Sequence, residues 1–191
     1  MPDEDQFAKM LESGKKAAAA LIGAGIPFLL GGGIASWARG GPPGDHDIDF
    51  FVKPADVVRA RQVLDEAGLR TEDPPENWLV KAFDGDVMID LIFEPAAGPI
   101  TDEVIERGDE MEVQALRMRV MTASDILVTK LLALREHYVD YDGVLEMARA
   151  LREQVDWEDV KERTRESPFA RAFFTLAEGL GIAPVGEPQR S

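Results

Sequence analysis

The chain has 191 residues, no cysteine and a formal net charge of −15, from 21 basic and 36 acidic side chains. Its 45% hydrophobic content is enough for a buried core, and its length fits one domain or a domain with a helical appendage. The composition excludes a disulfide framework and a zinc–thiolate site, and it argues against general binding to DNA or RNA, which depends on Lys and Arg.

The sequence carries no sign of a membrane or secretory segment. No apolar run approaches the roughly 20 residues that cross a bilayer. The acidic N-terminus lacks the basic start of a signal peptide. We therefore expect a cytoplasmic protein that does not bind membranes.

The first third of the chain alternates helices with short apolar strands. Apolar residues at helical spacing predict the helices, and apolar runs too short for a helix predict buried strands. A Gly–Pro cluster separates two of these elements, and Pro54 opens the last helix. The expected order is helix 4–24, strand 26–30, helix 34–39, strand 45–53 and helix 55–67.

The middle of the chain predicts a loop, a hairpin and one further strand. The hairpin is expected around an Asp–Gly turn at Asp84 and Gly85, between two runs of strand-forming residues. The expected order is loop 71–77, strands 78–83 and 87–93, a connection over 95–112 with a short helix near 101–107, and a strand within 113–121.

The last third predicts only helices. Thr122 and Asp125 form a capping-box pattern with Asp in place of the usual Glu, so a long helix is expected to follow as far as residue 138. Further helices are expected over 143–155, 157–166 and 168–179. Strands thus precede helices, which predicts an α/β domain over 1–120 and a helical C-terminal region over 121–184.

Two carboxylates open the second predicted strand. Asp47 and Asp49 are two residues apart and share one face of a strand, while Ile48 and Phe50 point the other way, towards a core. Close like charges beside an apolar run are costly unless a proton or a cation neutralises them. A divalent ion that prefers oxygen ligands, Mg²⁺ or Mn²⁺, is the simplest candidate.

A third carboxylate, Asp90, lies within the apolar strand 87–93. An unpaired ionised group there would cost several kcal/mol. Asp90 must therefore lie near an edge, pair with a base or join a metal site. If its strand lies beside that of Asp47 and Asp49, three carboxylates converge on the ion.

These features together resemble the nucleotidyltransferase signature of the DNA polymerase beta superfamily. The shared pattern is an apolar strand, Gly–Gly, a short helix, a glycine, Asp-x-Asp on a strand and a later acid. The chain resembles in particular the minimal bacterial members, which include antibiotic nucleotidyltransferases and toxins of the AbiEii type. The matching parts are Gly32–Gly33, helix 34–39, Gly40, Asp47-Ile48-Asp49 and Asp90.

The resemblance implies an α/β fold with a mixed sheet, flanking helices and a helical C-terminal extension. It implies a nucleotidyltransferase that moves a nucleoside monophosphate from an NTP such as ATP to a hydroxyl acceptor, with release of pyrophosphate. Asp47, Asp49 and Asp90 would be the catalytic and metal-binding residues, with Mg²⁺ or Mn²⁺ as the cofactor, and Asp90 would also be the general base.

Four more residues are candidates for nucleotide binding. A turn at Gly32 and Gly33 lets phosphates approach backbone N–H groups at the start of a helix. Ser36 lies early in that helix and offers a hydroxyl, or else has a structural role. Lys130 lies in an otherwise apolar helix face, and it either faces the nucleotide or extends to solvent.

An alternative function is an inactive binding or regulatory module that keeps the nucleotidyltransferase fold. Pro43 and Asp45 favour it, because they stand where many members of the superfamily have an Arg and a Thr. For an active enzyme, the negative charge favours a small-molecule acceptor over tRNA or protein. The only hint of a basic patch is the pair Arg117 and Arg119, which exposed charges on an edge strand explain equally well.

Overall fold

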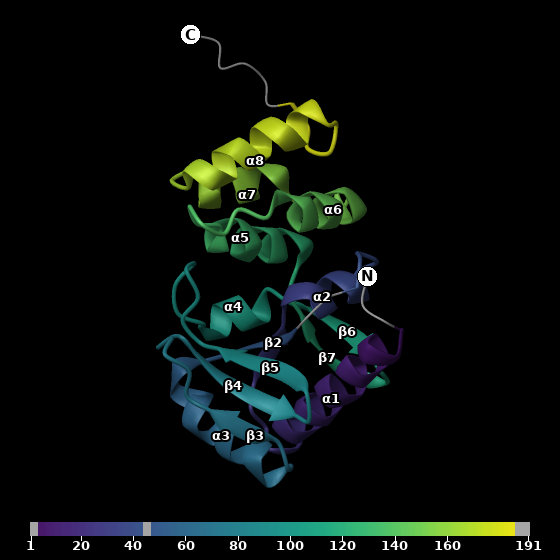
Figure 1. Cartoon of the computed structure of the whole chain (residues 1–191), viewed down its shortest axis with the longest axis vertical. Coiled ribbons are helices and arrows are strands. Elements are labelled where there is room, and N and C mark those ends of the chain that lie inside the picture. Colours follow the sequence, from purple (N-terminus) through teal and green to yellow (C-terminus); the bar gives the residue numbers. More distant parts are fainter. Residues whose placement is uncertain (1–3, 44–46, 186–191) are drawn as a thin grey trace.

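The computed structural model describes residues 4–43 and 47–185, and within this part of the chain seven strands form one mixed sheet (Figure 1). The strand order is β3-β4-β5-β2-β1-β7-β6. The β2–β5 and β1–β7 pairs are parallel, and the other pairs are antiparallel. The strands are β1 (Phe28–Leu30), β2 (Asp47–Val52), β3 (Arg70–Glu72), β4 (Leu79–Asp84), β5 (Val87–Ile92), β6 (Asp109–Val113) and β7 (Leu116–Val120).

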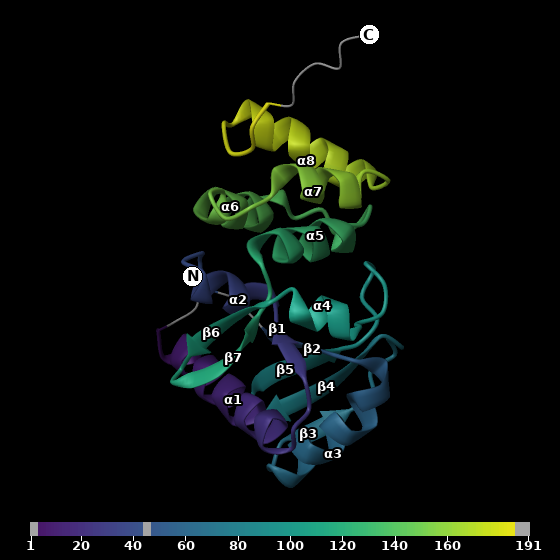
Figure 2. The same cartoon turned by 180° about the vertical axis from the view of Figure 1, so that it is seen from behind.

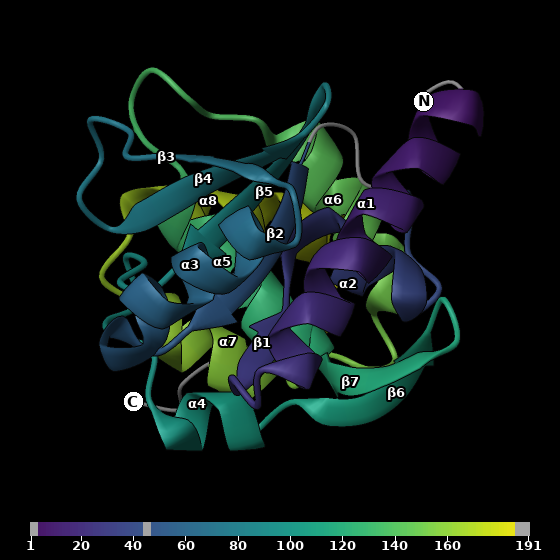
Figure 3. The ribbon, with the colours of Figure 1, turned by 90° about the horizontal axis from the view of Figure 1, so that it is seen from below.

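The helices divide between the sheet and the C-terminal region. Two of them, α1 and α3, lie on one face of the sheet. Figure 3 views the molecule from the side of these two helices. On the opposite side α2 and α4 lie next to the sheet, and the C-terminal helices follow from α5 to α8, which lies farthest from it (Figures 1 and 2). The helices are α1 (Glu4–Gly23), α2 (Gly32–Ala38), α3 (Val57–Glu66, after the 3₁₀ turn Pro54–Asp56), α4 (Asp102–Glu106), α5 (Ala123–Ala133), α6 (Tyr141–Leu151), α7 (Trp157–Thr164) and α8 (Pro168–Gly179).

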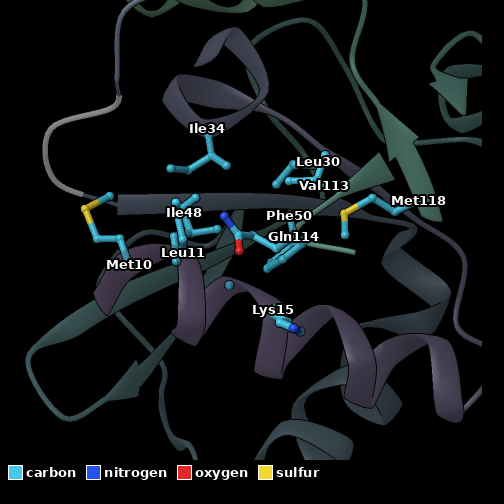
Figure 4. Close-up of a pocket in the computed structure, with 11 residues that line it drawn as sticks. Met10, Leu11, Lys15, Leu30, Ile34, Ile48, Phe50, Val113, Gln114 and Met118 are labelled. Atoms are coloured by element: carbon cyan, nitrogen blue, oxygen red, sulfur yellow. The ribbon is translucent and has the colours of Figure 1, made fainter. Parts of the chain in front are cut away.

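Strand β2 buries one face against α1 and turns its acids the other way. Ile48 and Phe50 are each 1% exposed, and both line a small cavity between β2 and α1 (Figure 4). Successive side chains of a strand alternate between faces. Asp47 and Asp49 therefore point away from α1, into a cleft that α5 also lines.

Two hydrophobic clusters make up the core of the described residues. The first lies around the sheet with α1, α2 and α3, and the second lies among α5 to α8. Helix α5 belongs to both, since Ile126 packs in the first cluster and Leu131 in the second. The helix thus joins the C-terminal helices to the sheet.

The structure confirms the predicted α/β class, with strands preceding a helical C-terminal region. It differs from the predicted elements at several places. The predicted loop 71–77 overlaps β3, and α6 ends at Leu151 instead of residue 155. The predicted connection 95–112 contains most of β6, which forms a hairpin with β7 in the predicted strand region 113–121. Helix α5 ends at Ala133 instead of residue 138, because Leu134 is extended and Arg135 and Tyr138 then exchange backbone hydrogen bonds.

No helix in the described part of the chain is long and apolar enough to span a membrane.

Candidate active site

Three carboxylates from two neighbouring strands converge on one face of the sheet. Asp47 and Asp49 project from β2, and the parallel register with β5 places Asp90 directly beside Asp49. One carboxylate oxygen from each residue lies within 4.8 Å of the others. The sequence predicted this convergence on condition that the two strands were neighbours, and they are.

The surroundings of the cluster oppose its full ionisation. Asp49 is 9% exposed and Asp90 is 6% exposed. Burial, and next the charge of Asp47, raise the pKa of Asp49 to about 7. Burial also raises the pKa of Asp90, although the ammonium group of Lys81 opposes that shift. The ionised form of these acids is therefore costly, and an added cation would stabilise it.

Gly32 leaves the space that the carboxylate of Asp49 occupies. It begins α2 with φ +58°, and a Cβ atom built on it would lie 1.7 Å from Asp49 Oδ2. Any larger residue would collide with this oxygen and would also adopt a backbone conformation that favours glycine. Gly32, which the sequence predicts to bind phosphate, thus makes room for a buried acid.

Asp47, Asp49 and Asp90 line a cleft of about 430 Å³ together with Gly32. Lys130 on α5 lines the same cleft, and its positive charge opposes the rise in the pKa of Asp49. The remaining lining residues are Phe51, Trp78, Ile92, Glu94, Pro95, Ala96, Ala97, Thr129, Ala133 and Arg135.

The other two predicted nucleotide-binding residues do not line this cleft. Gly33 follows Gly32 in the first turn of α2. The Ser36 hydroxyl is buried and has no hydrogen-bond partner among the described residues. It packs against Gly41, where an added Cβ atom would lie 2.2 Å from Ser36 Oγ. A direct role of Gly33 and Ser36 in nucleotide binding remains a prediction.

Sequence reasoning missed Lys81, the base that pairs with Asp90. Its Nζ lies 3.2 Å from Asp90 Oδ1. Of the three environments considered for Asp90, the edge is wrong, because β5 lies between β4 and β2. The other two environments are both present, because Asp90 pairs with Lys81 and also belongs to the acidic cluster. The hairpin turn carried the missing signal, since pairing Asp84 with Val87 places Lys81 opposite Asp90.

Two further sequence features have a definite place. Arg117 and Arg119 lie on β7 opposite Glu112 and Glu110 of β6, so glutamates face both arginines across the hairpin. Pro43 is half-buried, and Asp45 lies outside the described residues.

Comparison with known proteins gives a family and a fold. The model of a family described as uncharacterised nucleotidyltransferase matches residues 9–178. The solution structure of the antibiotic-resistance factor ANT(2″)-Ia is similar, with a TM-score of 0.64 and 17% identity over 91% of this chain and 97% of that one. A crystal structure of ANT(2″)-Ia with adenylyl-2″-tobramycin has a TM-score of 0.58 and 16% identity, covering 86% of this chain and 99% of that one. No curated protein matches the sequence.

Proposed function

The chain belongs to this family of nucleotidyltransferases, and from that premise we propose that it transfers a nucleoside monophosphate from an NTP to a hydroxyl of a small-molecule acceptor, with a divalent ion bound by Asp47, Asp49 and Asp90. One observation carries the proposal. The three carboxylates meet within 4.8 Å in a cleft that also exposes Lys130 and Arg135. Such a cleft offers negative groups for a metal and positive groups for phosphates.

The residues present fit a divalent ion. Mg²⁺ and Mn²⁺ favour carboxylate oxygens, and the cluster supplies one such oxygen from each of three side chains. The raised pKa of Asp49, about 7, reflects burial and the neighbouring charge of Asp47, which a bound cation would offset. When bound, the ion would neutralise phosphate charge and lower the pKa of an acceptor hydroxyl.

The remaining chemistry belongs to the chain. Asp90 accepts the proton of the acceptor hydroxyl, whose oxygen attacks the α-phosphorus as the bond to pyrophosphate breaks. Burial raises the pKa of Asp90. A carboxylate with a raised pKa is a stronger base, so it is better suited to accept this proton near neutral pH. Lys130 and Arg135 line the same cleft, where their positive charges would bind the phosphates and hold the leaving pyrophosphate.

The acceptor we favour is a small molecule that carries amines as well as hydroxyls. Glu94 and Trp78 line the same cleft as the acids, and a cleft with acidic and aromatic residues suits a cationic molecule. A comparison structure of ANT(2″)-Ia is in complex with adenylyl-2″-tobramycin, which is the adenylylated form of a small molecule of this kind. A tRNA acceptor lacks support, since glutamates face Arg117 and Arg119.

The proposal is tested with Asp47→Asn, Asp49→Asn and Asp90→Asn, each assayed for release of pyrophosphate from ATP and the other NTPs with Mg²⁺ and a panel of aminoglycosides. Each variant should lose at least about 100-fold in rate, the scale of a lost general base or metal ligand, while its circular dichroism stays that of the native fold. The matched control is Asp86→Asn, an exposed acid in the turn of the same hairpin.

Two results would contradict the proposed enzymatic activity. Full turnover by all three variants would separate the reaction from the acidic cluster. Binding of NTP and Mg²⁺ by calorimetry, without pyrophosphate release for any acceptor, would instead favour the inactive regulatory module.

A further inference from the structure

Lys81 extends a row of charged side chains that crosses three neighbouring strands. In the sheet register Asp90 on β5 lies opposite Asp49 on β2 and, on its other side, opposite Lys81 on β4. The three side chains therefore share one face of the sheet. The acidic cluster ends at a lysine on the β4 side.

The ammonium group of Lys81 contacts the side chains of Asp90 and Met88. Its Nζ lies 3.2 Å from Asp90 Oδ1 and 3.5 Å from Asp90 Oδ2, so it faces both carboxylate oxygens. Met88 Sδ lies 3.3 Å from the same nitrogen. The Lys81 side chain is 26% exposed and that of Asp90 is 9% exposed. This pair is fixed between strands, unlike an ion pair of two mobile surface side chains.

The position of this charge determines how many metal ions the cluster can hold tightly. Asp47 and Asp49 lie on β2, and the sheet register places Lys81 two strands away on β4. Together with one oxygen of Asp90 they can hold one ion. A second ion would need further contact with the Asp90 oxygens, which Lys81 already faces. It would also lie a few ångströms from a fixed positive charge, and that repulsion is substantial for a divalent cation.

We propose that Lys81 is a positioning residue that takes the place of a second divalent ion at Asp90, so that the nucleotide-free site binds one ion tightly instead of two. The proposal rests on the metal site of the proposed function. Lys81 holds the Asp90 carboxylate in place on the side of the cluster where the acceptor hydroxyl must lose its proton. It also supplies there the positive charge that a second ion would otherwise provide.

The test counts Mn²⁺ ions bound to the nucleotide-free protein by electron paramagnetic resonance, which does not require turnover. The wild-type protein should bind one ion tightly. Lys81→Met removes the charge and keeps most of the apolar stem, and it should bind two. The second ion should bind more tightly than in the wild type by at least about tenfold to a hundredfold, the factor expected in bulk water for one unit charge about 4 Å from a divalent ion.

Two further variants make the result specific. Lys53→Met is the matched control, because the Lys53 side chain is 25% exposed and pairs with Asp102 outside the cleft. It should bind one ion, like the wild type. Lys81→Arg retains the charge and should also bind one ion. Lys81→Gln serves as the second neutral variant if Lys81→Met does not fold.

The outcomes separate this proposal from the proposed function. Two tight ions in the wild type, or the same stoichiometry and affinity in wild type, Lys81→Met and Lys81→Gln, would overturn the role of Lys81 and leave the metal site standing. Failure of the wild type and of every variant to bind Mn²⁺ would overturn the metal site itself.

Discussion

Gly32 couples the start of a helix to the position of a buried acid. Its φ of +58° is one that L-residues rarely adopt, and the space where a Cβ atom would lie is filled by Asp49 Oδ2. Gly31 adds a backbone link, because its N–H donates to the carbonyl oxygen of Asp49 at 2.9 Å. Gly31 and Gly32 therefore help to position Asp49, whose carboxylate is one of the three proposed metal ligands.

We expect Gly32→Ala to weaken Mn²⁺ binding by at least about tenfold and to lower the free energy of unfolding by more than the roughly 1–2 kcal/mol of the backbone strain alone. The alanine methyl group must displace the Asp49 carboxylate. Calorimetric titration and urea unfolding measure the two effects. Gly40→Ala is the control, since Gly40 has φ +92° and open space around it. If the two variants behave alike, strain and not collision explains the loss.

At the scale of elements, the sequence was informative where hydrophobic patterns were strong. The helices α1 and α3 and the strands β2 and β5 were predicted because apolar residues recur at helical spacing or form short runs. The strand β3 was missed because its sequence, Arg-Thr-Glu, has no apolar residue. The strand β6 was missed because it is largely acidic and its turn, Gln114–Ala115, has φ of 51° and 60° without the usual Gly or Asn.

The candidate site was predictable to a similar extent. Asp47, Asp49 and Asp90 could be identified as chemically unusual, because each is a charge within an apolar strand. Their convergence depended on which strands are neighbours, and Asp90 lies 41 residues beyond Asp49 in the sequence. The pairing of Lys81 with Asp90 follows from the register of one hairpin and was within reach of sequence reasoning.

Helix α1 contains a glycine whose replacement should stabilise the protein. Gly14 lies in the middle of this 20-residue helix, where alanine is favoured by about 1 kcal/mol. Its added Cβ atom would lie 3.3 Å from Cδ1 of Ile48, a side chain that lines the small apolar cavity of about 20 Å³ in Figure 4 and has room to shift.

We therefore expect Gly14→Ala to raise the free energy of unfolding by about 0.5–1 kcal/mol, measured by urea denaturation. The control is Gly23→Ala at the last residue of the same helix, where nothing lies within 4 Å and the gain should be smaller. A loss of stability in Gly14→Ala would mean that Ile48 cannot move.

At the scale of the whole molecule, a polar clamp joins the C-terminal helices to the sheet. Asp125 in the first turn of α5 is 5% exposed. Its Oδ1 accepts hydrogen bonds from Arg163 on α7 at 2.6 Å and from Arg107, just after α4, at 3.3 Å. One carboxylate thus contacts both parts of the chain. We propose that these parts are two modules, 1–120 and 121–184, held together by this clamp and by the shared packing of α5.

Asp125→Asn should lower the free energy of unfolding at pH 7 by about 1–3 kcal/mol. It weakens the three charge-assisted hydrogen bonds that Arg107 and Arg163 donate to this buried carboxylate, while the arginines can still reach water. Urea denaturation measures the change. Asp159→Asn is the control, since Asp159 also pairs with Arg163 but its side chain is 43% exposed. That variant should lose less than about 1 kcal/mol. Equal losses would show that burial of Asp125 adds nothing to the clamp.

The same clamp predicts the sign of a pH effect. Burial opposes ionisation of Asp125, yet the hydrogen bonds from Arg163 and Arg107 lower its pKa below the ordinary value of 3.8. The stabilisation is therefore complete above the unfolded-state pKa and is lost as the pH falls through the lower folded-state pKa. The difference in unfolding free energy between wild type and Asp125→Asn should be constant from pH 7 to about pH 5 and should shrink below about pH 4. A difference that stays the same in acid would mean that the ionised Asp125 carboxylate does not hold the two modules together.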